Sequence, residues 1–284
     1  MTVSEGPFGA EADIDPGGDG GDPNSESARR AEATGEVWEN WSGGVRFEPD
    51  RIVEPESERE LQALVRQCRD EGRTVRVAGA GHSWTPVVET EDVVVSLAKL
   101  SGVVDHDPDA KEATVYAGTT LGDAGTALHD RDLALPNLGD VSTQTVAGAF
   151  ATGTHGTGPD FENLAGSLIG GRLVTGTGEI REFSAEDDPD LVRAARVSLG
   201  TLGIFTELRL DAQPSYKLQR REYCTTWTDC RDRLPELAAT NRNFDWSWYP
   251  RSDEVKLRLL NAPGGGTDHE ALPEATLVED ETGW

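Results

Sequence analysis

Thr-Val-Arg-Val-Ala-Gly-Ala-Gly-His-Ser-Trp, at residues 74–84, is the stretch that decides the fold. Residues 74–77 predict a short strand, and the glycines after it let the backbone approach a ligand closely, with successive N–H groups free to bind an anion. The loop is not the Rossmann fingerprint, because Trp84 stands where the third glycine would be. A tight structural turn explains the same glycines equally, so the loop alone leaves both interpretations open.

His82 is the unusual residue of this loop. A neutral imidazole at the rim of an anion-binding turn is a nucleophile at ordinary pH. The alternative is a histidine that only makes a hydrogen bond within the turn.

A second stretch of small residues lies further along the chain. Leu-Pro-Asn-Leu-Gly-Asp at 135–140 precedes Thr-Gln-Thr-Val-Ala-Gly-Ala-Phe-Ala-Thr-Gly-Thr-His-Gly-Thr-Gly at 143–158. Such a segment packs closely against something flat or against phosphates, and a loop of this length is usually functional or disordered. The hydroxyl groups of Thr145, Thr152 and Thr154 are suited to binding a ligand or to capping turns.

Strands and helices alternate around these two stretches. A capping box at 57–60 and apolar residues at helical spacing predict a helix that Gly72 ends. Further strands are predicted at 51–53, 92–97, 114–117 and 204–210, a hairpin at 167–175 and 179–183, and helices after Thr120 and from Asp190. Beyond Pro214 the pattern changes to a strand at 216–226, a helix to about 241, and strands at 244–249 and 255–260. The sequence therefore predicts an α+β fold containing α/β elements, with one domain over 36–214 and the beginning of a second over 215–262.

The two ends of the chain are polar and acidic. Residues 1–35 and 263–284 contain few large apolar side chains, so neither segment buries enough surface to offset chain entropy. Both are expected to be disordered tails.

Composition excludes several classes of function. The 284 residues carry 52 acidic and 26 basic side chains, a net charge of −26, which disfavours binding to nucleic acid or to anionic membranes. Lysine occurs four times only, and an acidic, lysine-poor surface is typical of a halophilic protein, because molar salt shortens the Debye length to about 3 Å. The alternative is an acidic tail on an ordinary acidic surface.

The cysteines and the N-terminus indicate the compartment. Cys68, Cys224 and Cys230 are odd in number and form no Cys-x-x-Cys pair, which argues against a disulfide framework and a metal site. No run approaches the roughly 20 apolar residues of a membrane span, and the first residues show no secretory signal. The expected location is cytoplasmic.

Five ordered segments together carry a resemblance. They are Trp38-Glu39-Asn40-Trp41, the Gly-x-Gly-His-Ser loop, Asn137-Leu138-Gly139, the Thr-Gly-Thr-His-Gly segment at 152–156, and Gly200-Thr201-Leu202-Gly203-Ile204. In this order they resemble the PCMH-type FAD-binding domain of the vanillyl-alcohol oxidase superfamily. The most similar branch is the aldonolactone oxidases, which includes gulonolactone, arabinono-1,4-lactone and alditol oxidases. The resemblance covers residues 36–214 well and residues 215–262 more loosely.

The resemblance implies a site. His82 stands at the position that is joined covalently to the flavin C8α methyl, and residues 78–83 would hold the pyrophosphate through backbone N–H groups. The residues that would contact FAD are Ala78, Gly79, Ala80, Gly81, His82, Ser83, Asp140, Thr145, Gly148, Thr152, Gly153, Thr154, His155 and Ile204. Trp38 and Trp41 are interpreted as packing residues.

The resemblance also implies a reaction. Hydride passes from a substrate carbon bearing a hydroxyl, in a sugar lactone or polyol, to flavin N5, and oxygen or another acceptor then reoxidises the flavin. A reductase of the UDP-N-acetylenolpyruvoylglucosamine type shares the fold but holds FAD without a covalent bond, and the histidine of Gly-His-Ser disfavours it.

The sequence departs from the pattern in its second domain. Relatives continue far beyond the point matched by Trp284 and include a His-Trp-Gly-Lys-like segment, so the substrate half is expected to be largely missing. The alternatives are a truncated non-catalytic FAD-binding remnant, or one part of a split oxidase completed by a second polypeptide. The sequence indicates no catalytic base, since Asp245, Arg251 and Arg258 are interpreted as surface charge.

Overall fold

The first layer is a small parallel sheet. The computed structural model describes residues 35–266 and 276–283. Strands β3 (Arg51–Val53), β4 (Val75–Ala78) and β5 (Val93–Ser96) pair in the order β3-β5-β4, with β5 in the centre. Helix α2 (Glu58–Asp70) begins at the predicted cap, where the Ser57 side chain accepts a hydrogen bond from Glu60 N. A two-stranded ribbon of β1 (Trp38–Glu39) and β2 (Arg46–Phe47) precedes this layer.

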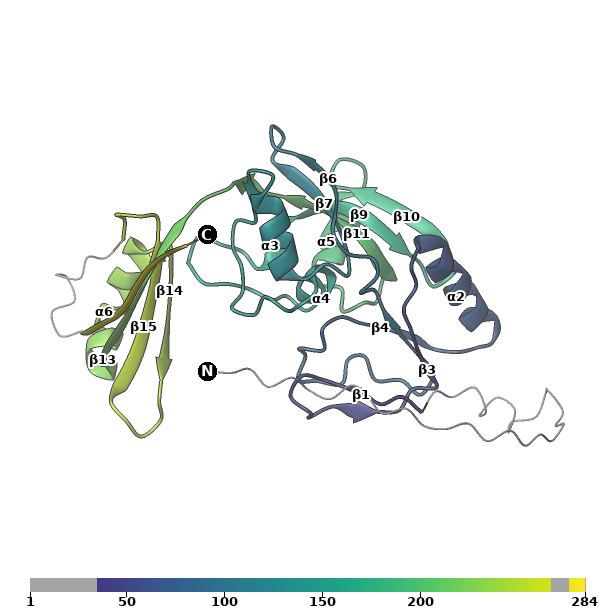
Figure 1. The fold of residues 1–284 in the computed structure, drawn as a ribbon, viewed down its shortest axis with the longest axis horizontal. Coiled ribbons are helices and arrows are strands. Elements are labelled where there is room, and N and C mark those ends of the chain that lie inside the picture. Colours follow the sequence, from purple (N-terminus) through teal and green to yellow (C-terminus); the bar gives the residue numbers. More distant parts are fainter. Residues whose placement is uncertain (1–34, 267–275, 284) are drawn as a thin grey trace, which may run out of the picture.

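A larger antiparallel sheet forms the second layer (Figure 1). It has the order β10-β9-β11-β7-β6, from β6 (Val103–Asp107), β7 (Glu112–Tyr116), β9 (Leu168–Val174), β10 (Ile180–Ser184) and β11 (Ile204–Asp211). The predicted hairpin around residues 176–178 is confirmed as β9 and β10, while β6 escaped prediction because its run Val-Val-Asp-His-Asp is mostly polar. Helices α3 (Leu121–His129) and α5 (Pro189–Arg196) lie where they were predicted. The short strands β8 (Leu133–Ala134) and β12 (Gln213–Pro214) pair with each other.

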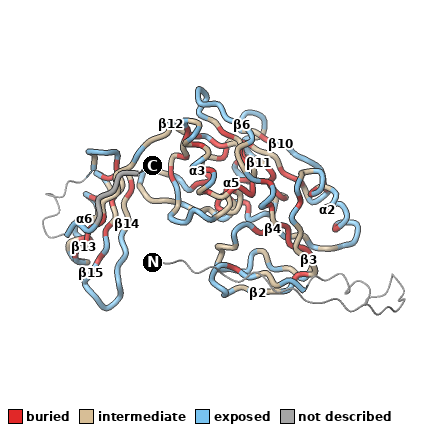
Figure 2. Tube along the Cα trace, viewed as in Figure 1, coloured by how far each residue is buried: buried red, intermediate tan, exposed pale blue. Residues whose placement is uncertain are grey.

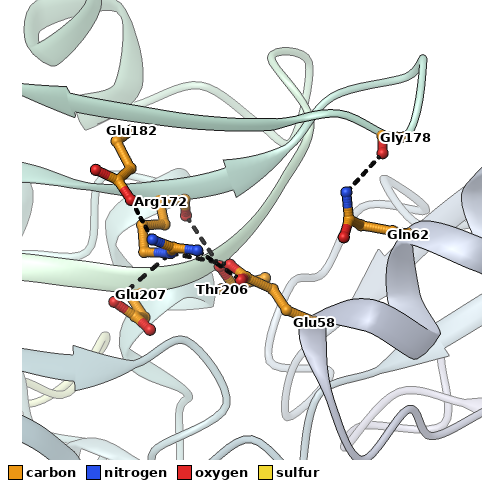
Figure 3. Close-up of polar contacts among 7 residues, drawn as sticks. All are labelled: Glu58, Gln62, Arg172, Gly178, Glu182, Thr206 and Glu207. Carbon is orange, nitrogen blue, oxygen red and sulfur yellow. Dashed lines mark hydrogen bonds and ion pairs between the residues drawn. The ribbon is translucent and has the colours of Figure 1, made fainter.

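A polar cluster joins the N-terminal end of α2 to the larger sheet (Figure 3). Arg172 on β9 donates to Glu58 at 2.8 Å, and the Thr206 hydroxyl donates to the same carboxylate at 2.6 Å. Hydrogen bonding to Arg172 lowers the pKa of Glu58, whereas burial raises the pKa of neighbouring Glu207. Gln62 adds a bond to a backbone carbonyl of the β9–β10 turn. These bonds fix α2, and the parallel sheet connected to it, against the larger sheet.

The C-terminal unit has its own sheet and core. Strands β13 (Leu218–Thr226), β14 (Asn243–Trp248), β15 (Glu254–Asn261) and β16 (Thr276–Gly283) pair in the order β14-β15-β13-β16, and helix α6 (Trp227–Thr240) covers one face. Figure 1 shows this sheet at one end of the molecule, apart from the other two. Its buried cluster is Tyr223, Cys230, Leu237, Val255, Leu257 and Leu259, separate from the cluster that spans residues 61–212. The buried segments in Figure 2 fall into the same two groups.

Strand β16 corrects the expectation of a disordered C-terminal tail. Residues 276–283 pair with β13 along most of its length. Thr-Leu-Val at the start of β16 are strand-forming residues, and β13 offers an open edge with unpaired backbone groups. The predicted disorder of residues 1–34, 267–275 and 284 falls outside the described residues.

Charged side chains connect the C-terminal unit to the rest. Arg258 pairs with Asp245 and with Asp140, both at 2.8 Å, and its side chain is only 27% exposed. The interpretation of Asp245 and Arg258 as surface charge is therefore wrong. Asp245 on β14 pairs with Arg258 on β15, and Arg258 also pairs with Asp140 outside the C-terminal unit. Arg251 is exposed. Arg242 lies between the rings of Phe161 and Tyr216, at 4.4 and 4.7 Å from their centroids.

No helix in the described part of the chain combines the length and apolarity that a membrane crossing requires. Residues 35–266 and 276–283 also contain no group of three or more His, Cys, Asp or Glu side chains arranged to hold a metal ion.

Candidate functional site

A cleft of about 670 Å³ is lined by residues of both the parallel and the antiparallel sheet. Its wall includes β4 and the loop after it, the ends of β5 and β9, the residues just after β7, the beginning of β11, and the cleft-facing residues of the stretch from Thr143 to Thr154. The volume lies in the range of pockets that bind a cofactor-sized molecule. The two glycine-bearing stretches, about 70 residues apart in sequence, therefore face one space.

Gly79 and Thr145 bring these stretches into contact. A Cβ atom at Gly79 would lie 2.3 Å from Thr145 Oγ1, closer than real Cβ atoms come to another heavy atom. Gly81 has a φ of +67°, in the left-handed region that glycine adopts without strain. The loop therefore needs both glycines, one for close approach and one for its backbone conformation.

The second stretch contains a helix that the sequence did not predict. Residues Val146–Ala151 form α4, and the Thr145 hydroxyl caps it by accepting a hydrogen bond from Gly148 N at 3.2 Å. Val146, Ala149 and Phe150 are buried, while Ala147, Gly148 and Ala151 line the cleft. Small residues on that face leave room beside the helix for a ligand.

Most residues assigned to the cofactor line this cleft. They are Ala78, Gly79, Ala80, Gly81, His82, Ser83, Thr145, Gly148, Thr152, Thr154 and Ile204.

Asp140, Gly153 and His155 do not line it. Asp140 is paired with Arg258, Gly153 lies against Val197, and His155 Nδ1 is 2.8 Å from the Gly156 carbonyl oxygen. Asp140 and His155 are thus engaged away from the cleft, and Gly153 supplies a positive φ of 68° for the turn after α4.

The His82 imidazole is held on two sides. Its Nε2 lies 2.9 Å from Thr143 Oγ1, and its ring stacks on Trp41 with centroids 5.3 Å apart and an angle of 20° between planes. Trp84 meets Trp41 edge-on at 5.0 Å. Nothing in the sequence places Thr143 beside His82, and the sequence motif predicts only a packing role for Trp41.

Asn40 is a further residue of the site that no sequence pattern singled out. Its side chain donates to the Ser83 carbonyl at 3.0 Å and accepts from Val45 N at 3.0 Å, although the residue is only 3% exposed. A buried asparagine that ties two backbone segments together holds both in place. The one sequence signal for a role of Asn40 is its position within the Trp-Glu-Asn-Trp motif, whose tryptophans are interpreted as packing residues.

The charge of the cleft is opposite to that of the chain. Among residues 35–266 and 276–283, no aspartate or glutamate lines the cleft, although the full chain has 52 acidic residues and a net charge of −26. The lining residues with a basic side chain are Arg76 and His82. An anionic group such as a diphosphate would thus meet an arginine there, with no carboxylate of the described lining to repel it. The wall fits a dinucleotide cofactor in size, close backbone approach and charge.

Comparison with known proteins agrees with this geometry. A family model described as FAD binding domain matches residues 49–184. Residues 49–184 are therefore an FAD-binding domain. Solved structures share the fold of the FAD-binding domain at low sequence identity. Cholesterol oxidase from Brevibacterium sterolicum superposes with a TM-score of 0.73 at 16% identity, over 80% of this chain and 47% of that one. Alkyldihydroxyacetonephosphate synthase superposes with a TM-score of 0.68 at 17% identity, over 78% and 48%.

Relatives with higher identity carry the names of lactone oxidoreductases. L-gulono-1,4-lactone dehydrogenase of Mycobacterium tuberculosis is 37% identical over 225 residues, covering 79% of this chain and 52% of the relative. D-arabinono-1,4-lactone oxidase of Eremothecium gossypii is 32% identical, over 75% and 41%. L-gulonolactone oxidase of Bos taurus is 31% identical, over 78% and 51%. The chain with its FAD-binding domain thus spans about half the length of the curated relatives it matches.

Proposed function

We propose that this chain is the flavin-bearing part of an FAD-dependent oxidoreductase that oxidises a CH–OH group of a sugar lactone or alditol. The observation that carries the proposal is the cleft, where two glycine-bearing stretches meet and where the described part of the chain places no acidic side chain. The names of the relatives support the substrate class.

The chain's own residues would hold the cofactor in two ways. The backbone of residues 78–83 would donate N–H groups to the diphosphate, and the small residues on the exposed face of α4 would pack against the remainder of the molecule. Thr152 and Thr154 would contribute hydroxyl groups from the second stretch. When bound, FAD would accept a hydride from the substrate at flavin N5.

His82 is the proposed point of covalent attachment to the flavin. It projects from the glycine loop, lines the cleft, and has one nitrogen engaged by Thr143. The other nitrogen, Nδ1, makes no hydrogen bond among the described residues and is the proposed nucleophile.

The proposal also covers the electron acceptor and the substrate site. The relatives include both a dehydrogenase and oxidases, so oxygen or another electron acceptor takes the electrons. The C-terminal sheet would form part of the substrate site.

The test uses the full chain reconstituted with FAD. Protein that stays yellow after acid precipitation would support the link at His82, and the variant His82→Ala should release its flavin into the supernatant. Turnover is measured with L-gulono-1,4-lactone, D-arabinono-1,4-lactone and xylitol, by peroxide release for oxygen and by bleaching of a dye for another acceptor. A chain that binds no FAD would refute the proposal.

A second candidate is a non-catalytic FAD-binding remnant. Binding of FAD by residues 49–184 does not by itself require turnover, so binding and turnover are tested separately. Tightly bound FAD without reduction by any of the three substrates would support this candidate.

Habitat and location are also proposed. The charge of −26 supports a halophilic protein, and the three free cysteines among the described residues suit the reducing cytoplasm.

A further inference from the structure

The β1–β2 ribbon is hydrogen-bonded to the loop that bears His82. Trp41 N donates to the Gly81 carbonyl at 3.2 Å, and the Asn40 side chain donates to the Ser83 carbonyl at 3.0 Å. These two bonds flank His82 in the sequence. The residue is therefore held on both sides by the same short ribbon.

Packing reinforces the two hydrogen bonds. A Cβ atom at Gly81 would lie 3.3 Å from the Trp38 ring and 3.5 Å from Asn40 Cα, so the loop lies directly against the ribbon. Asn40 itself is anchored by Val45 N, which donates to its side-chain oxygen. Ribbon and loop consequently form one packed unit at the wall of the cleft.

The imidazole is then fixed in orientation. Trp41 covers one face of the ring, and Thr143 engages Nε2 at 2.9 Å from the opposite stretch. In the tautomer whose Nε2–H donates to the threonine oxygen, the lone pair is on Nδ1 and is available for attachment. Stacking and the hydrogen bond restrict the rotamers of the His82 side chain. Less conformational entropy is then lost when the imidazole reacts with the flavin.

We propose that Trp41 and Asn40 are positioning residues for attachment of flavin to His82. This inference rests on the proposed function. In the attachment, a bond forms between the imidazole nitrogen and the C8α carbon, and one N–H and one C–H bond are broken. The two protons and two electrons pass to dioxygen, which becomes hydrogen peroxide, so atoms and electrons balance.

The experiment follows attachment in the full chain. Protein made without FAD is mixed with a saturating concentration of FAD, and acid-precipitable flavin is measured against time, with total bound flavin measured in parallel. Trp41→Ala should slow attachment about tenfold. The variant loses the stacking of Trp41 on His82, and the free energy of one aromatic pair corresponds to a change in rate of about that size. Asn40→Asp, which keeps the acceptor for Val45 but removes the donor to Ser83, should slow it several-fold, and Trp41→Phe should restore most of the rate. Noncovalent binding of FAD should persist in all three.

Trp246→Ala is the matched control. It removes a partly exposed, stacked tryptophan from the C-terminal sheet, and attachment should keep the parental rate. If Trp41→Ala does not fold by circular dichroism, Asn40→Asp and Trp41→Phe decide the question. Parental attachment rates in the folded variants overturn the proposal. A parent that binds FAD without a covalent link also overturns it but leaves the FAD-binding function standing, whereas a parent that binds no FAD overturns the proposed function as well.

Discussion

Replacing Gly79 by alanine would place a methyl group 2.3 Å from Thr145 Oγ1. The clash involves the hydroxyl group alone, because Thr145 Cβ and Cγ2 would each lie at an ordinary 3.5 Å. Relief requires Thr145 to turn away, which breaks its cap on α4. The two glycine-bearing stretches should therefore be coupled energetically through one oxygen atom.

The magnitudes follow from this geometry. Overpacking of this kind costs about 1–3 kcal/mol, offset by about 0.4–1 kcal/mol because alanine restricts the unfolded chain. Thr145→Ala alone should cost about 1 kcal/mol through loss of the helix cap. In Gly79→Ala/Thr145→Ala the clash is absent, so the double variant should be about 2 kcal/mol more stable than the sum of the single variants predicts.

The assay is urea denaturation of the FAD-free full chain, monitored by tryptophan fluorescence. Gly176→Ala is the matched control, since that glycine also lines the cleft but its Cβ position has nothing within 4 Å. It should change the free energy of unfolding by less than about 1 kcal/mol. Additivity of the two single variants within about 0.5 kcal/mol would refute the inferred contact between the stretches.

Three further predictions concern charge. Glu58→Gln should lower the free energy of unfolding at pH 7 by about 1–3 kcal/mol, because it removes a charged hydrogen-bond acceptor from Arg172. Folding lowers the pKa of Glu58, so its stabilisation is present above the ordinary pKa and is lost as pH falls through the folded value. Urea titrations at pH 7 and below pH 4 should therefore show a smaller difference in unfolding free energy between parent and Glu58→Gln at the lower pH. As a control, Glu182→Gln removes an exposed partner of Arg172 and should cost less than about 1 kcal/mol. Arg242→Ala should loosen the C-terminal sheet and speed proteolysis near residue 214, whereas unchanged cleavage would contradict the bridging role of this arginine. Raising KCl from low to molar concentration should raise the melting temperature by screening repulsion among carboxylates, and a fall would count against the halophilic proposal.

Sequence patterns predicted most of the fold because its main elements carry strong local signals. The capping box at Ser57, the hairpin around Gly176-Thr177-Gly178 and the strand from Ile204 appear where periodicity and turn residues place them. Helix α4 was missed, since Ala and Gly on its cleft face conceal the apolar spacing of Val146 and Phe150.

The site was predictable in part. Glycine spacing and the resemblance indicated two stretches that converge, and the structure brings both to one cleft. The partners of His82 depend on contacts between residues distant in sequence, which no local pattern encodes. Asp140 illustrates the same limit, because its pairing with Arg258, 118 residues away, draws it out of the predicted set.

The walls of the cleft come from two sheets. A cofactor bound in the cleft would therefore contact both sheets and stabilise their packing against each other. Any molecule that binds only the folded chain raises its stability in proportion to the logarithm of the free concentration divided by the dissociation constant. A tether at His82 would abolish that dependence, because a bonded molecule is not lost on dilution. The reinforcement would then be a fixed property of each matured molecule, insensitive to the flavin supply of the cell.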